Sequence, residues 1–360
     1  MIGLLDLPDE LLLLLVQHMR DIEDFTNAAC TCRRLRRVLN DTTPNVILRL
    51  AARSAPTFFH PHPWFLVLAT ARQVADWVIG NAERTRELMV AFRDGVEGLL
   101  ELALRVAGLT LSDIRRLHLD RYDIINPLCN LIDTMIGKQW YATPRFWNGG
   151  VSNANTLYAE IEPVTFQMLV YGELFGSTMR SFLEPERVLP RFGVDVRVEY
   201  LKYLAPAWIN KKGGFEGYEV LQTGPYAPDR AEELSEDYQE AIRFLIRSSG
   251  RWNRAWRRVV HRVAPDFEGE ENDWRQKLYW TAITQVGGLD GMELVAQGLD
   301  EDAEVPAAWR ERILEIRDRV AALDAKHAPR SVMFGKRDLE VSKAPDLAAE
   351  TRAYTKGRYE

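Results

Sequence analysis

The spacing of apolar and polar residues along the chain predicts helices almost throughout. Apolar residues recur every three or four positions in two long segments, residues 64–81 and 83–108, and Gly108 fits the end of the second helix. The same spacing recurs in residues 109–141, 164–183, 235–263, 271–288 and 306–326. Residues 194–209 have a mixed pattern that would also accommodate a short strand. We therefore predict a mainly α-helical fold with little or no β-structure.

The beginning of the chain has a hydrophobic run with an unusual setting. Six apolar residues, Leu11 to Val16, directly follow Pro8, Asp9 and Glu10. Proline and acidic residues both favour the first turn of a helix, so we predict a helix over residues 8–19. Two shorter helices should follow, the first capped by Asp21 or Asp24 and the second over residues 32–40 with four arginines. Three short helices enclose little core, so this unit should pack against a neighbour.

Length and composition divide the chain into a small module and a larger domain. The chain has 360 residues, of which 46% are hydrophobic and 27% charged, as expected for a folded protein with a sizeable core. We expect an N-terminal three-helix module over residues 1–45 and a proline-rich connection over 46–64. A larger irregular α-helical domain would occupy residues 65–326. A polar, partly disordered tail would occupy residues 327–360.

Charge, cysteine content and hydropathy exclude several classes of protein. A net charge of −6 gives no overall attraction to nucleic acid or to acidic membranes. An apolar run of six residues is too short to span a membrane, which needs about 20, and the acidic residues before it do not fit a signal peptide. Three cysteines, Cys30, Cys32 and Cys129, make no disulfide framework. We therefore expect a protein of the cytoplasm or nucleus.

The opening segment resembles an F-box. That family pattern is a Leu-Pro pair, a Glu and a hydrophobic helix, then an Asp-hydrophobic step and a Cys-basic-basic-hydrophobic ending. The matching residues here are Leu7, Pro8, Glu10, Leu11, Leu12, Leu15, Met19, Asp24, Phe25, Cys32, Arg33, Arg34 and Leu35. The Met19–Asp24 spacing is one residue longer than usual, Thr31 replaces an aliphatic residue and Leu35 replaces a tryptophan. These departures leave the register of docking open.

The remainder of the chain is similar to the helical C-terminal region of uncharacterised F-box proteins from filamentous fungi. The segments that carry this similarity are RRLHLDRYDIINPLCNLIDTMIGKQWY, YGELFG and VEYLKYLAPAW. Such regions have no agreed activity, so this part of the resemblance implies no particular substrate.

The resemblance implies a non-enzymatic substrate receptor of an SCF-type cullin–RING ubiquitin ligase. The module would bind a Skp-family adaptor, and through it a cullin, while the helical body would bind a protein substrate. No cofactor is implied. The residues expected to contact the adaptor are Leu7, Pro8, Leu11, Leu12, Leu15, Phe25, Cys32 and Leu35. Two alternatives stay open: a scaffold or regulator that binds the adaptor outside a ubiquitin ligase, and an enzyme with its site in the helical body.

Other motifs have a structural interpretation. Cys30, Cys32, His60 and His62 supply zinc-type ligands, but each pair is separated by a single residue, which is too close for a structural zinc site. Residues 250–262 alternate tryptophans with arginines, as a nucleic-acid surface does. On a helix, however, Trp252, Trp256 and Val259 share one face, which predicts a core stripe beside a solvated basic face. No catalytic signature and no metal site are predicted.

Overall fold

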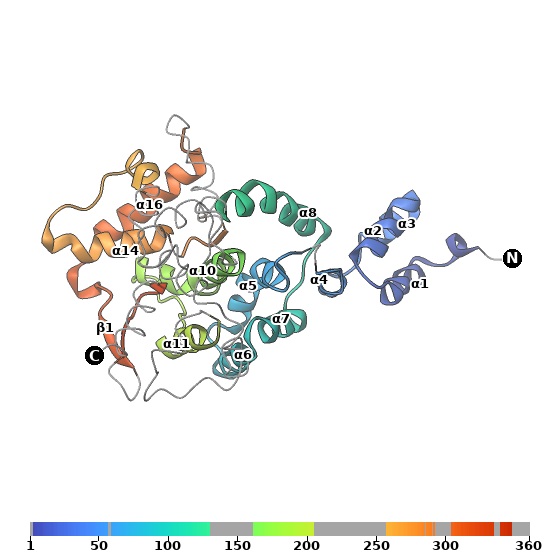
Figure 1. Ribbon diagram of the computed structural model, residues 1–360, viewed down its shortest axis with the longest axis horizontal. Helices are drawn as coiled ribbons and strands as arrows, with labels where there is room; N and C mark the ends of the chain where they lie inside the picture. Colours follow the sequence, from blue (N-terminus) through green and yellow to red (C-terminus); the bar gives the residue numbers. More distant parts are fainter. Residues whose placement is uncertain are drawn as a thin grey trace, which may run out of the picture.

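The structure is a computed structural model. It describes residues 3–56, 59–129, 161–204, 257–284, 286–289, 291, 304–334 and 339–347. Helices dominate this part of the chain, which confirms the predicted fold class (Figure 1). Trp252 and Trp256, two residues of the predicted core stripe, lie outside the described residues.

The N-terminal elements form a short helical arm at one end of the molecule. A 3₁₀ turn, η1 (Leu4–Asp6), precedes α1 (Asp9–Leu14), which continues into the 3₁₀ turn η2 (Leu15–His18). The helix predicted over residues 8–19 therefore changes from α to 3₁₀ geometry at Leu15. Two helices complete the arm: α2 (Ile22–Thr31) and α3 (Arg33–Leu39), which pack against each other, while α1 also packs on α3.

Five further helical elements follow, α4 (Pro44–Ala52), α5 (Trp64–Val78), α6 (Ala82–Arg93), α7 (Gly95–Val106) and α8 (Leu111–Asp120). The long helical pattern of residues 83–108 is divided between α6 and α7, because the chain turns at Asp94 and Gly95, where Gly95 has φ +71°. A left-handed φ suits glycine, which has no Cβ to clash. A π-helical turn, η3 (Arg121–Ile125), extends α8.

The segment predicted to be a proline-rich connection is more structured than the sequence suggested. Most of α4 lies within residues 46–64, and its Ile47, Leu48 and Leu50 side chains are buried. Phe59 is also buried, and its ring lies 6.3 Å from that of Phe65 in α5. The segment therefore packs into the core between the arm and the rest of the protein.

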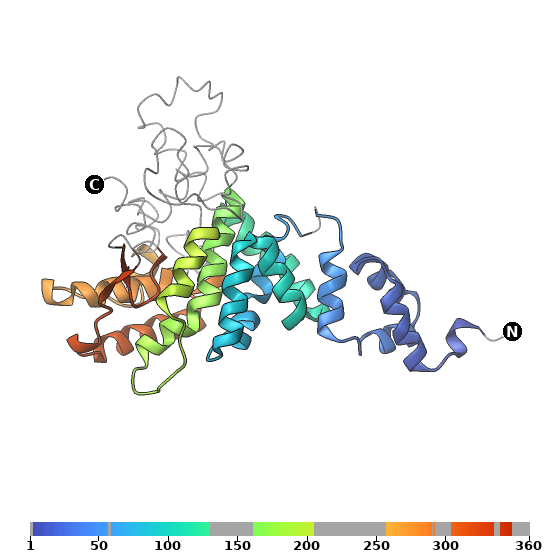
Figure 2. The same ribbon diagram turned by 90° about the horizontal axis from the view of Figure 1, so that it is seen from below.

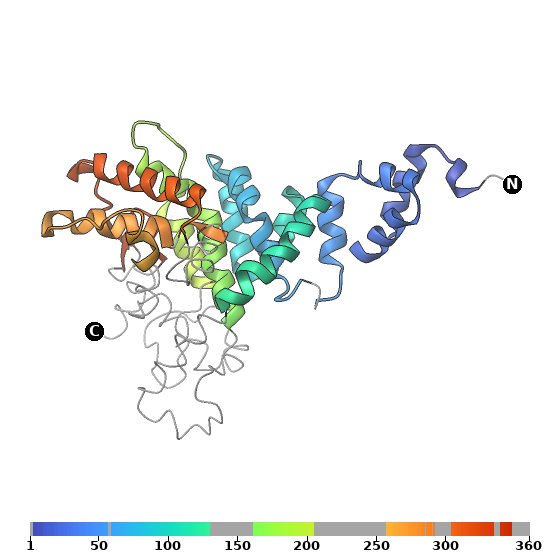
Figure 3. The same cartoon turned by 90° about the horizontal axis from the view of Figure 1, so that it is seen from above.

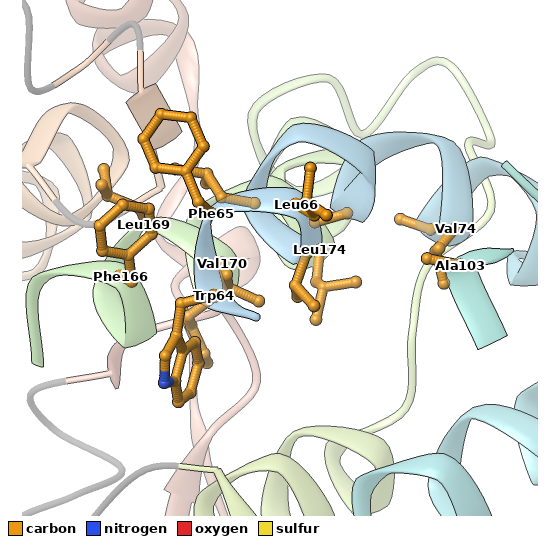
Figure 4. Packing of buried hydrophobic residues seen from close by; sticks show 14 of the residues in the cluster. Trp64, Phe65, Leu66, Val74, Ala103, Phe166, Leu169, Val170 and Leu174 are labelled. Atoms are coloured by element: carbon orange, nitrogen blue, oxygen red, sulfur yellow. The ribbon is translucent and has the colours of Figure 1, made fainter. Parts of the chain in front are cut away.

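The core of the larger domain is centred on the contact between α5 and α10 (Ile161–Leu183). Phe65 of α5 packs on Phe166 of α10 with ring centroids 5.6 Å apart, and Leu169, Val170 and Leu174 continue the contact along α10 (Figure 4). On its other side α5 packs on α7, and α11 (Val194–Tyr203) packs on α6. Residues 194–203 are helical, so the described part of the segment 194–209 contains no strand.

The C-terminal part adds two packed helices and a small hairpin. The helices α14 (Asp273–Thr284) and α16 (Ala307–Ala322) pack together. The 3₁₀ turn η5 (Glu270–Asn272) precedes α14, and the 3₁₀ turn η6 (Ala325–His327) follows α16. The antiparallel strands β1 (Ser331–Phe334) and β2 (Leu339–Ser342) pair Ser331 with Ser342. This hairpin lies inside the region predicted as a polar tail, in which Ala344 and Leu347 are buried.

The predicted core stripe near residue 259 is described only in part. Val259 is buried, whereas Arg258 and Arg262 are exposed.

Among the described residues, no helix has both the length and the apolar character needed to cross a membrane.

Figures 2 and 3 show that the molecule is elongated. The arm with η1 and α1 projects from one end, and α14, α16 and the hairpin lie at the other. The helices α4 to α7 lie between these ends.

Candidate partner-binding site

The arm exposes apolar side chains on its first two elements. Leu4 and Leu5 of η1 are 52% and 44% exposed, and Leu11 and Leu14 of α1 are 46% and 48% exposed. We call these four residues the exposed leucine set. Leu11 and Leu14 are three positions apart, which places them on the same side of the helix. Folded proteins bury most large aliphatic side chains, so a group of half-exposed leucines at the end of a projecting arm is typical of a surface that a partner covers.

The opposite side of α1 forms the core of the arm. Leu12 is fully buried and Val16, one turn later, is 3% exposed. Ile22 and Phe25 of α2 and Leu35 and Val38 of α3 complete this core. The leucine run therefore serves two purposes: one side of the helix holds the arm together, and the other is free for contact.

The eight residues predicted to contact an adaptor fall into three groups. Pro8 and Leu11 are exposed, and Leu7, Leu15 and Cys32 are half-buried. Leu12, Phe25 and Leu35 are buried within the arm itself, with exposures of 0%, 0% and 6%. These three side chains therefore pack inside the arm beneath the exposed ones, and contact of the eight residues with an adaptor stays a prediction.

The exposed residues Leu4, Leu5 and Leu14 were not among those predicted from the sequence to contact an adaptor. The signal that could have found Leu14 is its spacing of three from Leu11, which the continuous run of leucines obscures. Leu4 and Leu5 lie ahead of the predicted helix, in the 3₁₀ turn η1.

Arg34 holds the N-terminal segment onto α3. Its guanidinium donates hydrogen bonds to the carbonyl oxygens of Leu5 and Leu7, the latter at 2.7 Å, and to Oδ1 of Asp9 at 2.9 Å. Arg37 donates to Oδ2 of the same carboxylate at 3.3 Å. The hydrogen bond from Arg34 and the two positive charges hold the pKa of Asp9 below its ordinary value. One arginine therefore positions η1, the turn at Leu7 and the first residue of α1.

Two local caps define the helices behind this surface. The Asp21 carboxylate accepts a hydrogen bond from the backbone N–H of Asp24 at 2.9 Å, which begins α2. The Cys32 sulfur accepts one from the N–H of Leu35 at 3.5 Å, which begins α3. Capping groups of this kind satisfy donors that a helix N-terminus leaves unpaired. Cys32 is thus the N-cap of α3.

The arm is joined to the body through α4. On the arm side, the buried hydroxyl of Ser54, which lies just after the end of α4, accepts a hydrogen bond from the N–H of Ile22 at 3.4 Å. On the body side, the Asn45 amide donates to the carbonyl oxygens of Leu104 and Ala107 at 2.8 and 3.1 Å. The N–H of Leu109 also donates to the carbonyl of Pro44 at 2.9 Å. Contacts on both sides of α4 thus fix the direction in which the arm projects.

No group of three or more His, Cys, Asp or Glu side chains that could hold a metal ion occurs in the part of the chain that the structure describes. The three cysteines all lie among the described residues and form no disulfide: Cys30 is exposed, Cys32 is half-buried and Cys129 is buried.

Comparison with known proteins identifies the same segment. Residues 4–43 match the family model for an F-box-like domain. Searches of curated proteins and of solved structures found no significant match. The matched residues begin at Leu4 and include η1, α1, α2 and α3, the elements that carry the exposed leucine set and its support.

Proposed function

We propose that this chain is an F-box subunit that binds a Skp-family adaptor through its arm and a protein substrate through its helical body. Ubiquitination of that substrate by a cullin–RING ligase would follow from this assembly. One observation carries the proposal: the segment that matches an F-box-like domain is also the segment that presents half-exposed leucines away from the rest of the fold (Figure 1).

The exposed leucine set is the proposed centre of the adaptor interface. Covering one leucine side chain fully is worth about 1.5–3 kcal/mol, so a half-exposed leucine contributes on the order of 1 kcal/mol. Four such side chains contribute about 4 kcal/mol together, which only matches the lower end of the cost of association, about 4–15 kcal/mol. We therefore infer that a tight interface also covers Pro8 and the half-buried Leu7, Leu15 and Cys32.

Within such an assembly the chain would act by proximity. The ubiquitin-transferring cysteine and the RING domain would belong to other subunits, and this chain would raise the local concentration of a substrate lysine near them. The contacts of α4 with α2 of the arm and with α7 of the body support this role, because a fixed joint would hold a bound substrate in a defined position. A location in the cytoplasm or nucleus, where ubiquitin ligases of this class work, is part of the same proposal.

Co-purification of the full chain with a fungal Skp-family adaptor and a cullin tests the proposal. Leu11→Asp and Leu14→Asp should abolish adaptor binding, because each would bury an unpaired charge in the interface. Leu314→Asp is the matched control, since Leu314 lies in α16 of the body and is 41% exposed. The control variant should bind the adaptor as the native chain does.

The pattern of results separates the alternatives. Binding of the adaptor but not of a cullin would favour a scaffold or regulator that acts outside a ubiquitin ligase. Retained adaptor binding by both Leu11→Asp and Leu14→Asp would exclude the exposed leucine set as the interface. Removal of residues 1–41 provides a second reference that should lose all adaptor binding.

A further inference from the structure

A pocket of about 490 Å³ lies far from the arm, at the C-terminal end of α10. It is formed where the end of α10, the segment that follows it, η6 and the open end of the hairpin meet. The residues that line it are Ser181, Phe182, Pro185, Arg191, Lys326, His327, Ala328, Arg330 and Lys343. Four of these side chains carry a positive charge, a fifth is histidine, and none is acidic.

This concentration of positive charge contrasts with the rest of the protein, whose net charge is −6. Lys326 has one carboxylate partner, Asp324, at 2.9 Å. The Arg191 guanidinium lies 5.5 Å from the centre of the Phe182 ring, which orients it along one wall. In the described parts of the chain, no carboxylate lies within 4.0 Å of the charged groups of Arg191, Arg330 or Lys343, so their charges are available to a ligand.

The hairpin places two of these cations side by side. The N–H of Lys343 donates to the carbonyl of Arg330 at 3.1 Å, one position beyond the pair Ser331 and Ser342. The fully buried Arg197 of α11 fixes this end of the hairpin by donating to the carbonyl of Lys343 at 3.0 Å. Like charges opposite each other on antiparallel strands are destabilising. An anion between them would remove this repulsion.

A second, larger pocket, of about 660 Å³, differs from the first in the charges of its lining. It is lined by α5, α10 and α16 and contains both arginines and acids, which pair with each other. Arg72 binds Glu173 at 2.7 Å, and Arg319 binds Glu184 at 2.7 Å. Because these charges are already paired, the larger pocket favours neither anions nor cations. The smaller pocket, which we call the cationic pocket, is therefore the stronger candidate for a ligand-binding site.

We propose that the cationic pocket binds a phosphate monoester, with Arg330, Lys343 and Arg191 holding the phosphate. Guanidinium groups donate paired hydrogen bonds that match phosphate oxygens, and a nearby ammonium adds a point charge. The volume lies within the usual range for small-molecule sites, about 300–1,000 Å³, and therefore leaves space for the group that carries the phosphate. That group is either a free metabolite or a phosphorylated side chain of another protein, since both present the same dianion.

Isothermal titration of the full chain with three probes tests the site and distinguishes the two sources. The probes are inorganic phosphate, glycerol 3-phosphate, and a short blocked alanine peptide with one phosphoserine. We expect saturable binding that weakens with added salt. Tighter binding of glycerol 3-phosphate would identify a small metabolite as the source, and tighter binding of the peptide would identify a phosphorylated protein. Either result supports the site.

Three variants make the test specific. R330Q/K343Q should weaken binding of the preferred probe about tenfold or more, because it removes two charge-assisted contacts. R86Q/R115Q removes the same net charge from exposed positions on α6 and α8 and should leave binding unchanged. D324N frees Lys326 from its partner and should strengthen binding about two- to threefold. No binding of any probe, or equal affinities for native chain and R330Q/K343Q, would overturn the proposal.

Discussion

The Arg34 guanidinium lies 2.9 Å from Oδ1 of Asp9 across the interface between α3 and α1. The same side chain also reaches the carbonyl oxygens of Leu5 and Leu7. Asp9 and Arg34 are each partly exposed, at 46% and 36%, so the ion pair itself adds little to the free energy of folding. Its consequence is positional: it holds η1 and the start of α1 in one arrangement before a partner arrives.

Arg34→Gln should weaken adaptor binding more than it weakens the fold. Without the guanidinium, residues 4–7 lose their hydrogen bonds to α3. Part of the binding free energy must then offset the conformational entropy that these residues lose when the adaptor orders them. We expect about a tenfold loss of adaptor affinity by titration calorimetry, with little change in helix content. The control is Arg33→Gln, since the neighbouring Arg33 is exposed and none of the hydrogen bonds that position η1 comes from it. Equal affinities for the two variants would contradict the positional role of Arg34.

The same contact predicts a pH dependence. The pKa of Asp9 is lower in the folded protein than its ordinary value, first because of the hydrogen bond from Arg34. A carboxyl of this kind stabilises the fold at a pH above its unfolded pKa, and loses that contribution as the pH falls through its folded pKa. The stability difference between Asp9→Asn and the native chain should therefore be constant near neutral pH and shrink below about pH 4. Urea unfolding at several pH values measures this difference, with Asp41→Asn as the exposed control.

Leu11→Ala and Leu12→Ala should separate binding from folding. Leu12 is fully buried, so its truncation leaves a cavity and should lower the free energy of unfolding by about 2–5 kcal/mol. Leu11 is 46% exposed, and its truncation should change stability by less than about 0.5 kcal/mol while weakening adaptor binding. Chemical unfolding and adaptor titration of both variants check this. Similar losses of stability in the two variants would show that the two sides of α1 are not distinct.

Gly108 should not tolerate a side chain, because a Cβ at this position would lie 2.6 Å from the backbone carbon of Pro44 in α4. Gly108→Ala would push α4 away from α7, and we expect a loss of about 1–3 kcal/mol of stability. Gly176 in α10 is the matched control: its Cβ would lie 3.7 Å from the nearest atom. Gly176→Ala should be neutral or stabilising by up to about 1 kcal/mol, because glycine is a poor helix former. Thermal unfolding of both variants measures the difference.

Two buried tyrosines should respond oppositely to loss of the hydroxyl. The hydroxyl of Tyr200 donates a 2.6 Å hydrogen bond to the carbonyl of Gln167, so Tyr200→Phe should destabilise by about 1 kcal/mol. The Tyr279 hydroxyl is buried without a hydrogen-bond partner among the described residues, and burial raises its pKa. Tyr279→Phe should therefore leave the unfolding midpoint unchanged or raise it. A clear loss of stability in Tyr279→Phe would show that its hydroxyl is paired after all.

Much of the arm could be predicted because its signals are local. Pro8 and the acids after it mark the first turn of α1, and Asp21 caps α2, each through groups within a few residues. The division of residues 83–108 into two helices was less visible, because the turn at Gly95 interrupts a pattern that is apolar on both sides. The helix α4 was missed because prolines near it suggested an extended connection, whereas its buried side chains depend on α2 and α7.

The helical class and the position of the F-box-like segment can be predicted from the amino-acid sequence, because apolar periodicity and capping act over three or four residues. Which leucines are covered depends on tertiary packing, since Leu11 and Leu12 are identical in type and differ only in what packs on them. The same holds for the cationic pocket: Arg191 and Arg330 are far apart in the chain, and the packing of the hairpin beside α10 brings them to one site. Helices can be predicted from residues that are close together in the sequence, whereas burial and the clustering of charges depend on contacts between residues that are far apart in the sequence.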